Sequence, residues 1–207
     1  MRTIGTIRCA AAGGLLLALA TVLPAGAAQE SDWPCVQRLV PSLEAGQMWS
    51  GPPLDSVAGR PAPPELDQLA RALIDPDLAP EAMDAKVRAF ADAMPAEQRA
   101  ERLTLLFRTA LDRLNEERAN LIAGIKRYAK RQRALAEKIT AETRDLAAAK
   151  KDAPGDGPRL QELQAAYDWD TRVFTDRARQ LRLVCDQPVR LEQRAFALAR
   201  AIQGHLP

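Results

Sequence analysis

The fold is decided by residues 95–151, which read PAEQRAERLTLLFRTALDRLNEERANLIAGIKRYAKRQRALAEKITAETRDLAAAKK. After Pro95 this stretch has no proline and one glycine, Gly124, so little in it interrupts a helix. Its apolar positions alternate at spacings of four and three residues, which is the period of a coiled-coil seam. The seam positions are Phe107, Leu111, Leu114, Arg118, Leu121, Ile125, Tyr128, Gln132, Leu135, Ile139, Glu142, Leu146 and Ala149.

A turn and a second seam follow this stretch. Residues 152–158 read DAPGDGP, a concentrated turn signal, and Gly204 is well placed to end the next helix. Folding the two seams together about the turn places Leu135 opposite Phe174 and Phe107 opposite Ile202, as antiparallel packing requires. The pattern predicts an antiparallel coiled-coil hairpin over residues 95–204. The second seam comprises Leu160, Leu163, Tyr167, Asp170, Phe174, Arg177, Leu181, Val184, Pro188, Leu191, Ala195, Leu198 and Ile202.

Six seam positions depart from the apolar rule. The polar ones are Arg118, Gln132, Glu142, Asp170 and Arg177. Such residues usually fix register and partner number at a cost in stability, and the alternative is that they bind a partner helix or ligand inserted into the hairpin. Pro188 lacks a backbone N–H and should kink or break the second helix. Because the repeat keeps its phase across Pro188, we favour a kink; a break would allow the seam to pair between two chains.

Residues 64–94 predict two shorter helices. Pro64 and Pro80 suit first helical turns, and Asp75-Pro76-Asp77 separates the two segments. Apolar residues outside the seams gather at the open end of the hairpin, so the short helices should pack there. The predicted fold class is therefore all-α, with a long antiparallel coiled-coil hairpin and a small helical bundle at its open end. These off-seam residues are Leu103, Leu105, Leu106, Ile122, Leu183, Val189 and Phe196.

Residues 1–28 resemble a secretory signal peptide in their pattern. Arg2 and Arg8 precede an apolar run that is too short to span a bilayer comfortably, and small residues follow it. We expect cleavage after Ala27 or Ala28; the alternative is an uncleaved signal anchor. No later apolar stretch is long enough to span a membrane, so we expect a periplasmic or secreted protein without a transmembrane segment in the mature chain.

Residues 29–63 form a proline-rich arm that cannot hold a long helix. Two cysteines, Cys35 and Cys185, remain after cleavage, and in an oxidising compartment they indicate one disulfide. Closing so long a loop would stabilise the fold by roughly 4–5 kcal/mol in the chain-entropy model. The alternative is two free or intermolecular thiols.

The least generic stretch is Asp32-Trp33-Pro34-Cys35-Val36-Gln37. It resembles the N-terminal segment of a group of uncharacterised secreted bacterial helical proteins, over about the first twenty-five mature residues, which implies export and helical structure but no activity. A weaker resemblance is carried by residues 94–99, MPAEQR, entering a long helix. That element is similar to one in small helical periplasmic chaperones of the Spy and CpxP kind, although the leading Leu-Thr is missing.

Charge and residue chemistry narrow the function. Removing residues 1–28 removes two of the 29 basic residues and none of the 27 acidic ones, so the mature chain has no formal net charge. This balance argues against nucleic acid and against a polybasic membrane-surface role. His205 is the only histidine, and no phosphate loop or nucleophile elbow is present. We expect neither enzymatic activity nor a metal or cofactor.

We expect a non-enzymatic coiled-coil interaction protein, an adaptor or scaffold that binds another envelope protein, with homo-oligomerisation as a possibility. The alternatives are a periplasmic holdase-type chaperone, which should expose an apolar face, and a small-ligand-binding helical protein with a pocket near its tryptophans. Candidate partner contacts are the turn at the hairpin tip and the tryptophans of the arm, although burial in the bundle is the simpler reading of the latter. These residues are Trp33, Trp49, Pro154, Gly155, Asp156 and Gly157.

Overall fold

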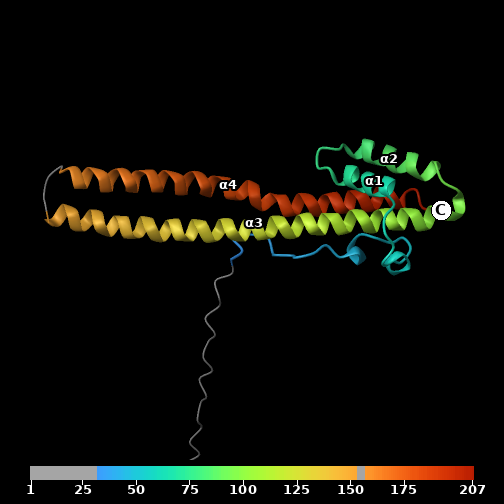
Figure 1. Cartoon of the computed structure of the whole chain (residues 1–207), viewed down its shortest axis with the longest axis horizontal. Coiled ribbons are helices and arrows are strands. Elements are labelled where there is room, and N and C mark those ends of the chain that lie inside the picture. Colours follow the sequence, from blue (N-terminus) through green and yellow to red (C-terminus); the bar gives the residue numbers. More distant parts are fainter. Residues whose placement is uncertain (1–31, 153–156) are drawn as a thin grey trace, which may run out of the picture. The chain divides into compact units, whose positions relative to one another are not determined.

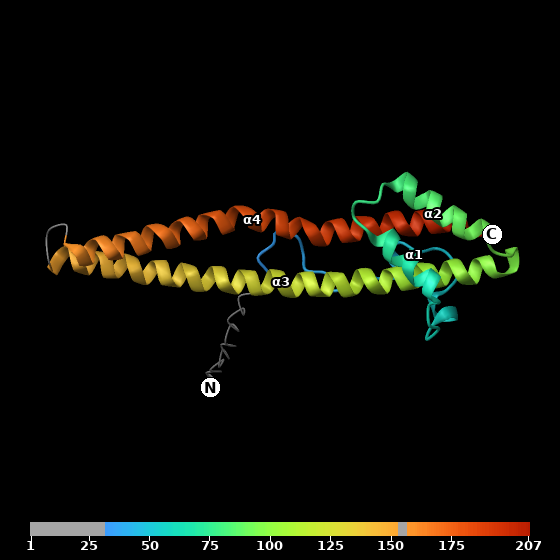
Figure 2. The ribbon, with the colours of Figure 1, turned by 45° about the horizontal axis from the view of Figure 1, so that its top comes forward.

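Two very long helices dominate the computed structural model, which describes residues 32–152 and 157–207 (Figure 1). Helix α3 spans Ala96–Asp152, and α4 spans Pro158–Gln203. They run side by side in opposite directions in both views (Figures 1 and 2). The predicted all-α class and the antiparallel hairpin are confirmed. The proposed signal peptide, residues 1–28, lies outside the described residues.

The shorter elements begin and end where prolines require it. Helices α1, Pro64–Ile74, and α2, Pro80–Asp92, each begin with proline in the first turn, where its missing N–H costs nothing. Two 3₁₀ turns precede them, η1 at Ala45–Gln47 and η2 at Leu54–Val57. The Ser42 hydroxyl donates to the Glu44 carboxylate at 2.9 Å and makes no helix cap.

A hydrophobic core joins the short elements to the base of the hairpin. Phe107 is its largest fully buried side chain, and α1 packs mainly on α3 while α2 packs on α4. In both views α1 and α2 lie at the end of the hairpin away from its turn (Figure 2). The core includes Leu43, Val57, Leu66, Leu73, Met83, Val87, Leu103, Leu106, Phe107, Leu114, Leu191, Leu198 and Ile202.

Side-chain bonds between α3 and α4 agree with the predicted register. The Tyr128 hydroxyl donates to the carbonyl of Arg177, and Gln132 Nε2 donates to the carbonyl of Phe174 at 3.2 Å. A helical carbonyl points toward the residue one turn further on. The two acceptor oxygens therefore lie beside Leu181 and Arg177, which face Tyr128 and Gln132 in the register that pairs Leu135 with Phe174.

Pro188 does not break the hairpin. Helix α4 continues through it to Gln203, and Pro188 is buried against the partner helix.

Two of the apolar residues expected to line the bundle are exposed instead. Leu183 is 65% exposed and Val189 is 37% exposed, so neither contributes a full face to the core.

The described residues therefore divide into a body and a stalk, named here by their residues. The body comprises residues 32–125 and 183–207, which include the hydrophobic core. The stalk comprises residues 126–152 and 158–182. Among the stalk residues only Ala129, Leu146 and Asp170 are buried. The remaining seam positions of the stalk are half-buried, apart from exposed Arg177, as a bare two-helix pair requires.

Candidate functional site

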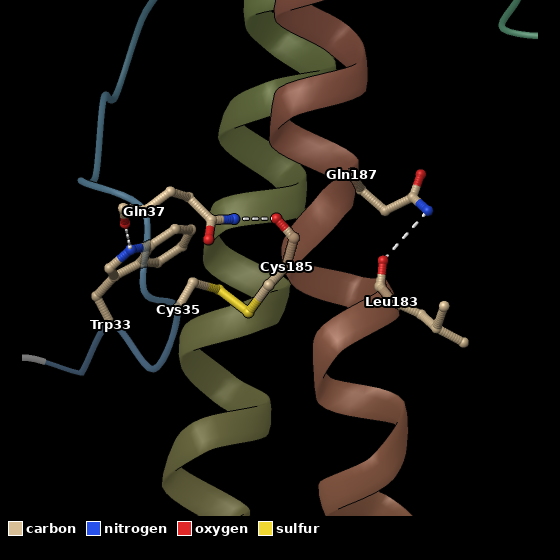
Figure 3. Close-up of a disulfide and its surroundings, with 6 residues drawn as sticks. All are labelled: Trp33, Cys35, Gln37, Leu183, Cys185 and Gln187. Carbon is tan, nitrogen blue, oxygen red and sulfur yellow. Dashed lines mark hydrogen bonds between the residues drawn. A yellow bond between two sulfur atoms is a disulfide. The ribbon is translucent and has the colours of Figure 1, made fainter.

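The arm is attached to the hairpin where the body meets the stalk. The sulfur atoms of Cys35 and Cys185 lie 2.01 Å apart, which confirms the predicted disulfide (Figure 3). Gln37 Nε2 donates to the carbonyl of Cys185, and Trp33 Nε1 donates to the carbonyl of Gln37 at 2.7 Å. Asp32 pairs with Arg133 of α3. The indole of Trp33 thus braces the arm itself.

Arg118 links the arm to both long helices. Its side chain extends from α3 and is almost fully buried. Nε donates to the Val40 carbonyl at 2.8 Å, and one terminal nitrogen donates to the Pro188 carbonyl at 2.6 Å. Burial lowers the pKa of this guanidinium, and the Glu192 carboxylate counteracts that effect. The seam arginine is therefore satisfied within the chain by backbone oxygens.

Trp49 packs against the hydrophobic core of the body. Its ring stacks on Phe107 with the centroids 4.3 Å apart, and Nε1 donates to the Pro52 carbonyl at 2.8 Å. A Cβ atom at Gly51 would lie 2.4 Å from the Trp49 ring, so only glycine fits there without a shift. Measured along α3, Phe107 and the Arg133 contact of the arm are about 39 Å apart. The two tryptophans predicted as partner contacts therefore do not share one site.

The other polar seam residues lie in the stalk. Lys138 Nζ lies 2.5 Å from Asp170 Oδ2 and 3.5 Å from Glu142 Oε1. The hydrogen bond to Asp170, followed by the attraction of the two carboxylates, raises the pKa of Lys138. Gln132 Oε1 and Glu142 Oε2 are buried without a hydrogen-bond partner. Arg177 differs from the rest, because its side chain is exposed and its carbonyl accepts the Tyr128 bond.

The tip of the hairpin has a small cavity. Of the predicted turn contacts, Gly157 is exposed, whereas Pro154, Gly155 and Asp156 lie outside the described residues. A cavity of about 490 Å³ lies beside Gly157 and is lined by both apolar and charged side chains. Its lining comprises Asp145, Ala148, Ala149, Asp152, Gly157, Arg159, Leu160 and Leu163.

Sequence reasoning overlooked one residue of the stalk. Trp169 is 63% exposed on α4, more than either Trp33 or Trp49. The sequence could have indicated this exposure. Trp169 directly precedes the seam residue Asp170, and in this register that position faces away from the partner helix. Trp169 is therefore a large apolar side chain exposed on the outside of the stalk.

The described residues were compared with the requirements of a metal site and of a membrane-spanning helix. Within residues 32–152 and 157–207, no three His, Cys, Asp or Glu side chains gather closely enough to hold a metal ion. His205 Nε2 lies 2.9 Å from Asp84 Oδ1, which joins the C-terminal segment to α2. Over the same residues, no helix has an apolar stretch that could cross a bilayer.

Comparison of the chain with protein-family models, with curated proteins and with solved structures finds no match. The stalk, the tip and the arm are therefore the features that bear on the function of this protein.

Proposed function

We propose that this protein is a non-enzymatic interaction protein of the cell envelope, an adaptor or scaffold that uses its stalk to bind another protein. The stalk carries the proposal. It projects beyond the body, yet it buries only Ala129, Leu146 and Asp170 among its described residues. A segment that adds so little buried surface contributes little to folding stability. Its length is more simply explained by a contact made away from the body.

The proposed function requires a location outside the cytoplasm. The signal-peptide pattern of residues 1–28 supports export, and the Cys35–Cys185 pair is typical of an oxidising compartment. We propose a periplasmic or secreted mature chain on these grounds. The arm then serves to fasten the N-terminal residues to the root of the stalk.

The geometry favours the tip over the arm as the contact site. Trp49 is stacked in the body, and Trp33 donates its N–H within the arm. The tip cavity beside Gly157 is instead lined by the apolar side chains of Leu160 and Leu163 together with the charged Asp152 and Arg159. Such a surface can accept an apolar side chain, while its charges select the partner.

Two other functions receive less support. A holdase-type chaperone needs a continuous exposed apolar surface. The large apolar side chains that are exposed in the described residues are four, Val36, Trp169, Leu183 and Val189, and they do not form one patch. A small-ligand site near the tryptophans would require Trp33 and Trp49 to lie together, and they lie far apart along α3.

The test removes the tip without disturbing the body. A variant in which residues 140–168 are replaced by a short turn rejoins α3 and α4 in the same register. A matched control replaces Val36, an exposed apolar residue of the arm, by serine and leaves the tip unchanged. Both should export and keep the disulfide, and affinity purification from envelope extracts should recover the partner with the control alone. Recovery of the same partner with the shortened variant would rule out the tip.

A further inference from the structure

The neutral net charge of the mature chain averages over two regions of opposite character. The stalk carries 14 basic and 8 acidic side chains, whereas the body carries 13 basic and 17 acidic ones. The basic excess of the stalk comes from residues 126–133 and 176–182, which we call the basic belt. The belt has eight basic side chains and a single acidic one, Asp176. Overall neutrality therefore does not exclude an electrostatic contact made by the stalk alone.

The basic belt is one concentrated positive surface at the root of the stalk. Its two segments face each other across the hairpin, because the Tyr128 hydroxyl of α3 donates to the carbonyl of Arg177 in α4. Among the described residues, two of the eight cations form ion pairs, Arg133 with Asp32 and Arg179 with Asp176. The other six have no carboxylate at ion-pair distance there, and all of them except Lys126 are exposed. Cations gathered in this way repel one another and attract an anionic partner.

The arm distinguishes the two sides of the stalk. Cys185 of α4 and Arg133 of α3, which both bind the arm, each directly follow a seam residue. Successive residues of a helix are turned by about 100° from each other, so the residues before and after a seam position lie on opposite sides. Leu183 precedes the seam residue Val184, and Figure 3 shows it pointing away from the disulfide. We call this side, which the arm does not cover, the open side.

Exposed apolar side chains and cations share the open side. Trp169 and Leu183 each precede a seam residue, and their side chains are 63% and 65% exposed. They lie two heptads apart along α4, about 21 Å at 1.5 Å rise per residue. Polar side chains separate them on this side, so they are two isolated anchors and no continuous stripe. Arg127 and Arg131 of α3 also precede seam residues and are exposed.

We propose that the open side of the stalk lies on a lipid surface with anionic phosphate headgroups, with the stalk parallel to the membrane plane. The inference goes beyond the proposed function and does not use the tip, residues 140–168. The cations of the basic belt attract the headgroups, and each lysine or arginine near an anionic surface strengthens binding roughly fivefold. Trp169 and Leu183 enter the boundary between headgroups and acyl chains, the depth at which tryptophan is enriched.

The isolated apolar anchors favour a lipid surface over other anionic partners. A polyanion in solution neutralises cations but gains nothing from an exposed indole ring, whereas a bilayer accepts single apolar side chains at any spacing. A second copy of this chain fits poorly, because two open sides packed together would bring Arg127 and Arg131 of both copies close to each other. Two anchors bury little apolar surface, so the contact depends on charge and therefore on salt.

The experiment measures sedimentation of the full mature chain, with its disulfide, together with lipid vesicles. One preparation is phosphatidylcholine alone, and the other contains phosphatidylcholine and phosphatidylglycerol in equal amounts. Binding to the anionic vesicles should be at least about tenfold stronger and should weaken as salt rises. Tryptophan fluorescence should shift to shorter wavelength on these vesicles, because the Trp169 indole leaves water. Trp169→Phe, which keeps Trp33 and Trp49, should lose that shift.

A charge-reversal variant locates the electrostatic part of the contact. Arg127→Glu with Arg131→Glu should weaken binding to the anionic vesicles at least about tenfold. The matched control is Arg38→Glu with Lys86→Glu, which changes the net charge equally at exposed cations of the arm and of α2. The control should bind within about a factor of two of the parent, because these cations lie away from the open side. Circular dichroism verifies that both variants keep the parental helix content.

An apolar variant locates the inserted side chains. Trp169→Ser should weaken binding to the anionic vesicles at least about tenfold, since it removes the larger of the two anchors. Val36→Ser is the matched control, because Val36 is an exposed apolar residue of the arm, and it should bind as the parent does.

Equal binding to the two vesicle preparations, or unchanged binding by either open-side variant, overturns the inference. So does vesicle binding that Trp169→Ser leaves intact and that soluble polyphosphate competes away, because the ligand is then a polyanion in solution. The tip experiment measures recovery of a protein partner, so its outcome and the outcome of the vesicle experiment are independent.

Discussion

Replacing Arg118 by alanine tests how the arm is joined to α3 and α4. The buried guanidinium donates to the Val40 carbonyl at 2.8 Å and to the Pro188 carbonyl at 2.6 Å. A hydrogen bond from a charged group contributes about 1.5–3 kcal/mol, and a buried acceptor left unpaired costs about 1–3 kcal/mol. Pro188 lies inside α4, where an N–H further along the helix can still serve its carbonyl. The bond to Val40 is only part-buried, so water can serve that carbonyl, and the loss of the two charge-assisted bonds should cost about 3 kcal/mol.

Thermal unfolding followed by circular dichroism measures this effect. For a chain of this size each kcal/mol shifts Tm by about 2–4 °C, so Arg118→Ala should melt roughly 6–12 °C below the parent. Arg88→Ala is the matched control, because Arg88 is an exposed arginine of α2 that pairs with Asp84, and it should melt with the parent. If the two variants melt together, the bonds of Arg118 do not hold the arm and our reasoning about the junction is wrong.

Three further outcomes follow from the structure. Leu135→Asp or Phe174→Asp places a charge in the seam and should unfold the stalk, seen as a partial loss of helical circular dichroism; a parental melt would refute the register. The hydrogen bond from Arg113 lowers the pKa of Asp67. Asp67 therefore stabilises the fold at pH values above its ordinary pKa near 3.8, and this stability is lost as the pH falls through the lowered pKa. Asp67→Asn should flatten the acid-induced loss measured by urea unfolding, and an unchanged pH profile would contradict this. Cys185→Ser should lower the free energy of unfolding by up to roughly 4–5 kcal/mol, seen as a lower denaturant midpoint, whereas an equal midpoint would show that the bond adds nothing.

The hairpin was predictable because its determinants repeat. The four-three spacing around Leu135 and Phe174 continues over many heptads, and the turn signal of residues 152–158 separates two uninterrupted helices. The disulfide followed from elimination, since Cys35 and Cys185 are the only cysteines after residue 28. Prolines set the starts of α1 and α2 for a local steric reason.

The contacts that join the arm and α1 to the long helices were not predictable, because they follow no repeat in the sequence. Asn115 accepts from the Leu43 N–H at 2.7 Å and donates to the Leu43 carbonyl at 3.1 Å, which fixes the arm to α3. Arg194 similarly donates to the carbonyls of Leu73 and Leu78. Whether such a polar side chain finds a backbone partner depends on the path that the irregular segments take in space. The exposure of Trp169 also required the structure, since aromatic residues are usually buried.

The disulfide determines how a pulling force travels through the molecule. A load applied between the N-terminal end of the arm and the tip passes from Cys35 directly into α4 at Cys185, and from there along the stalk. That route contains a covalent bond and avoids α1, α2 and the core around Phe107. A tether at the N-terminus would therefore let the stalk bear tension while the body remains folded and unloaded, and reduction of the bond would redirect the same tension through the body.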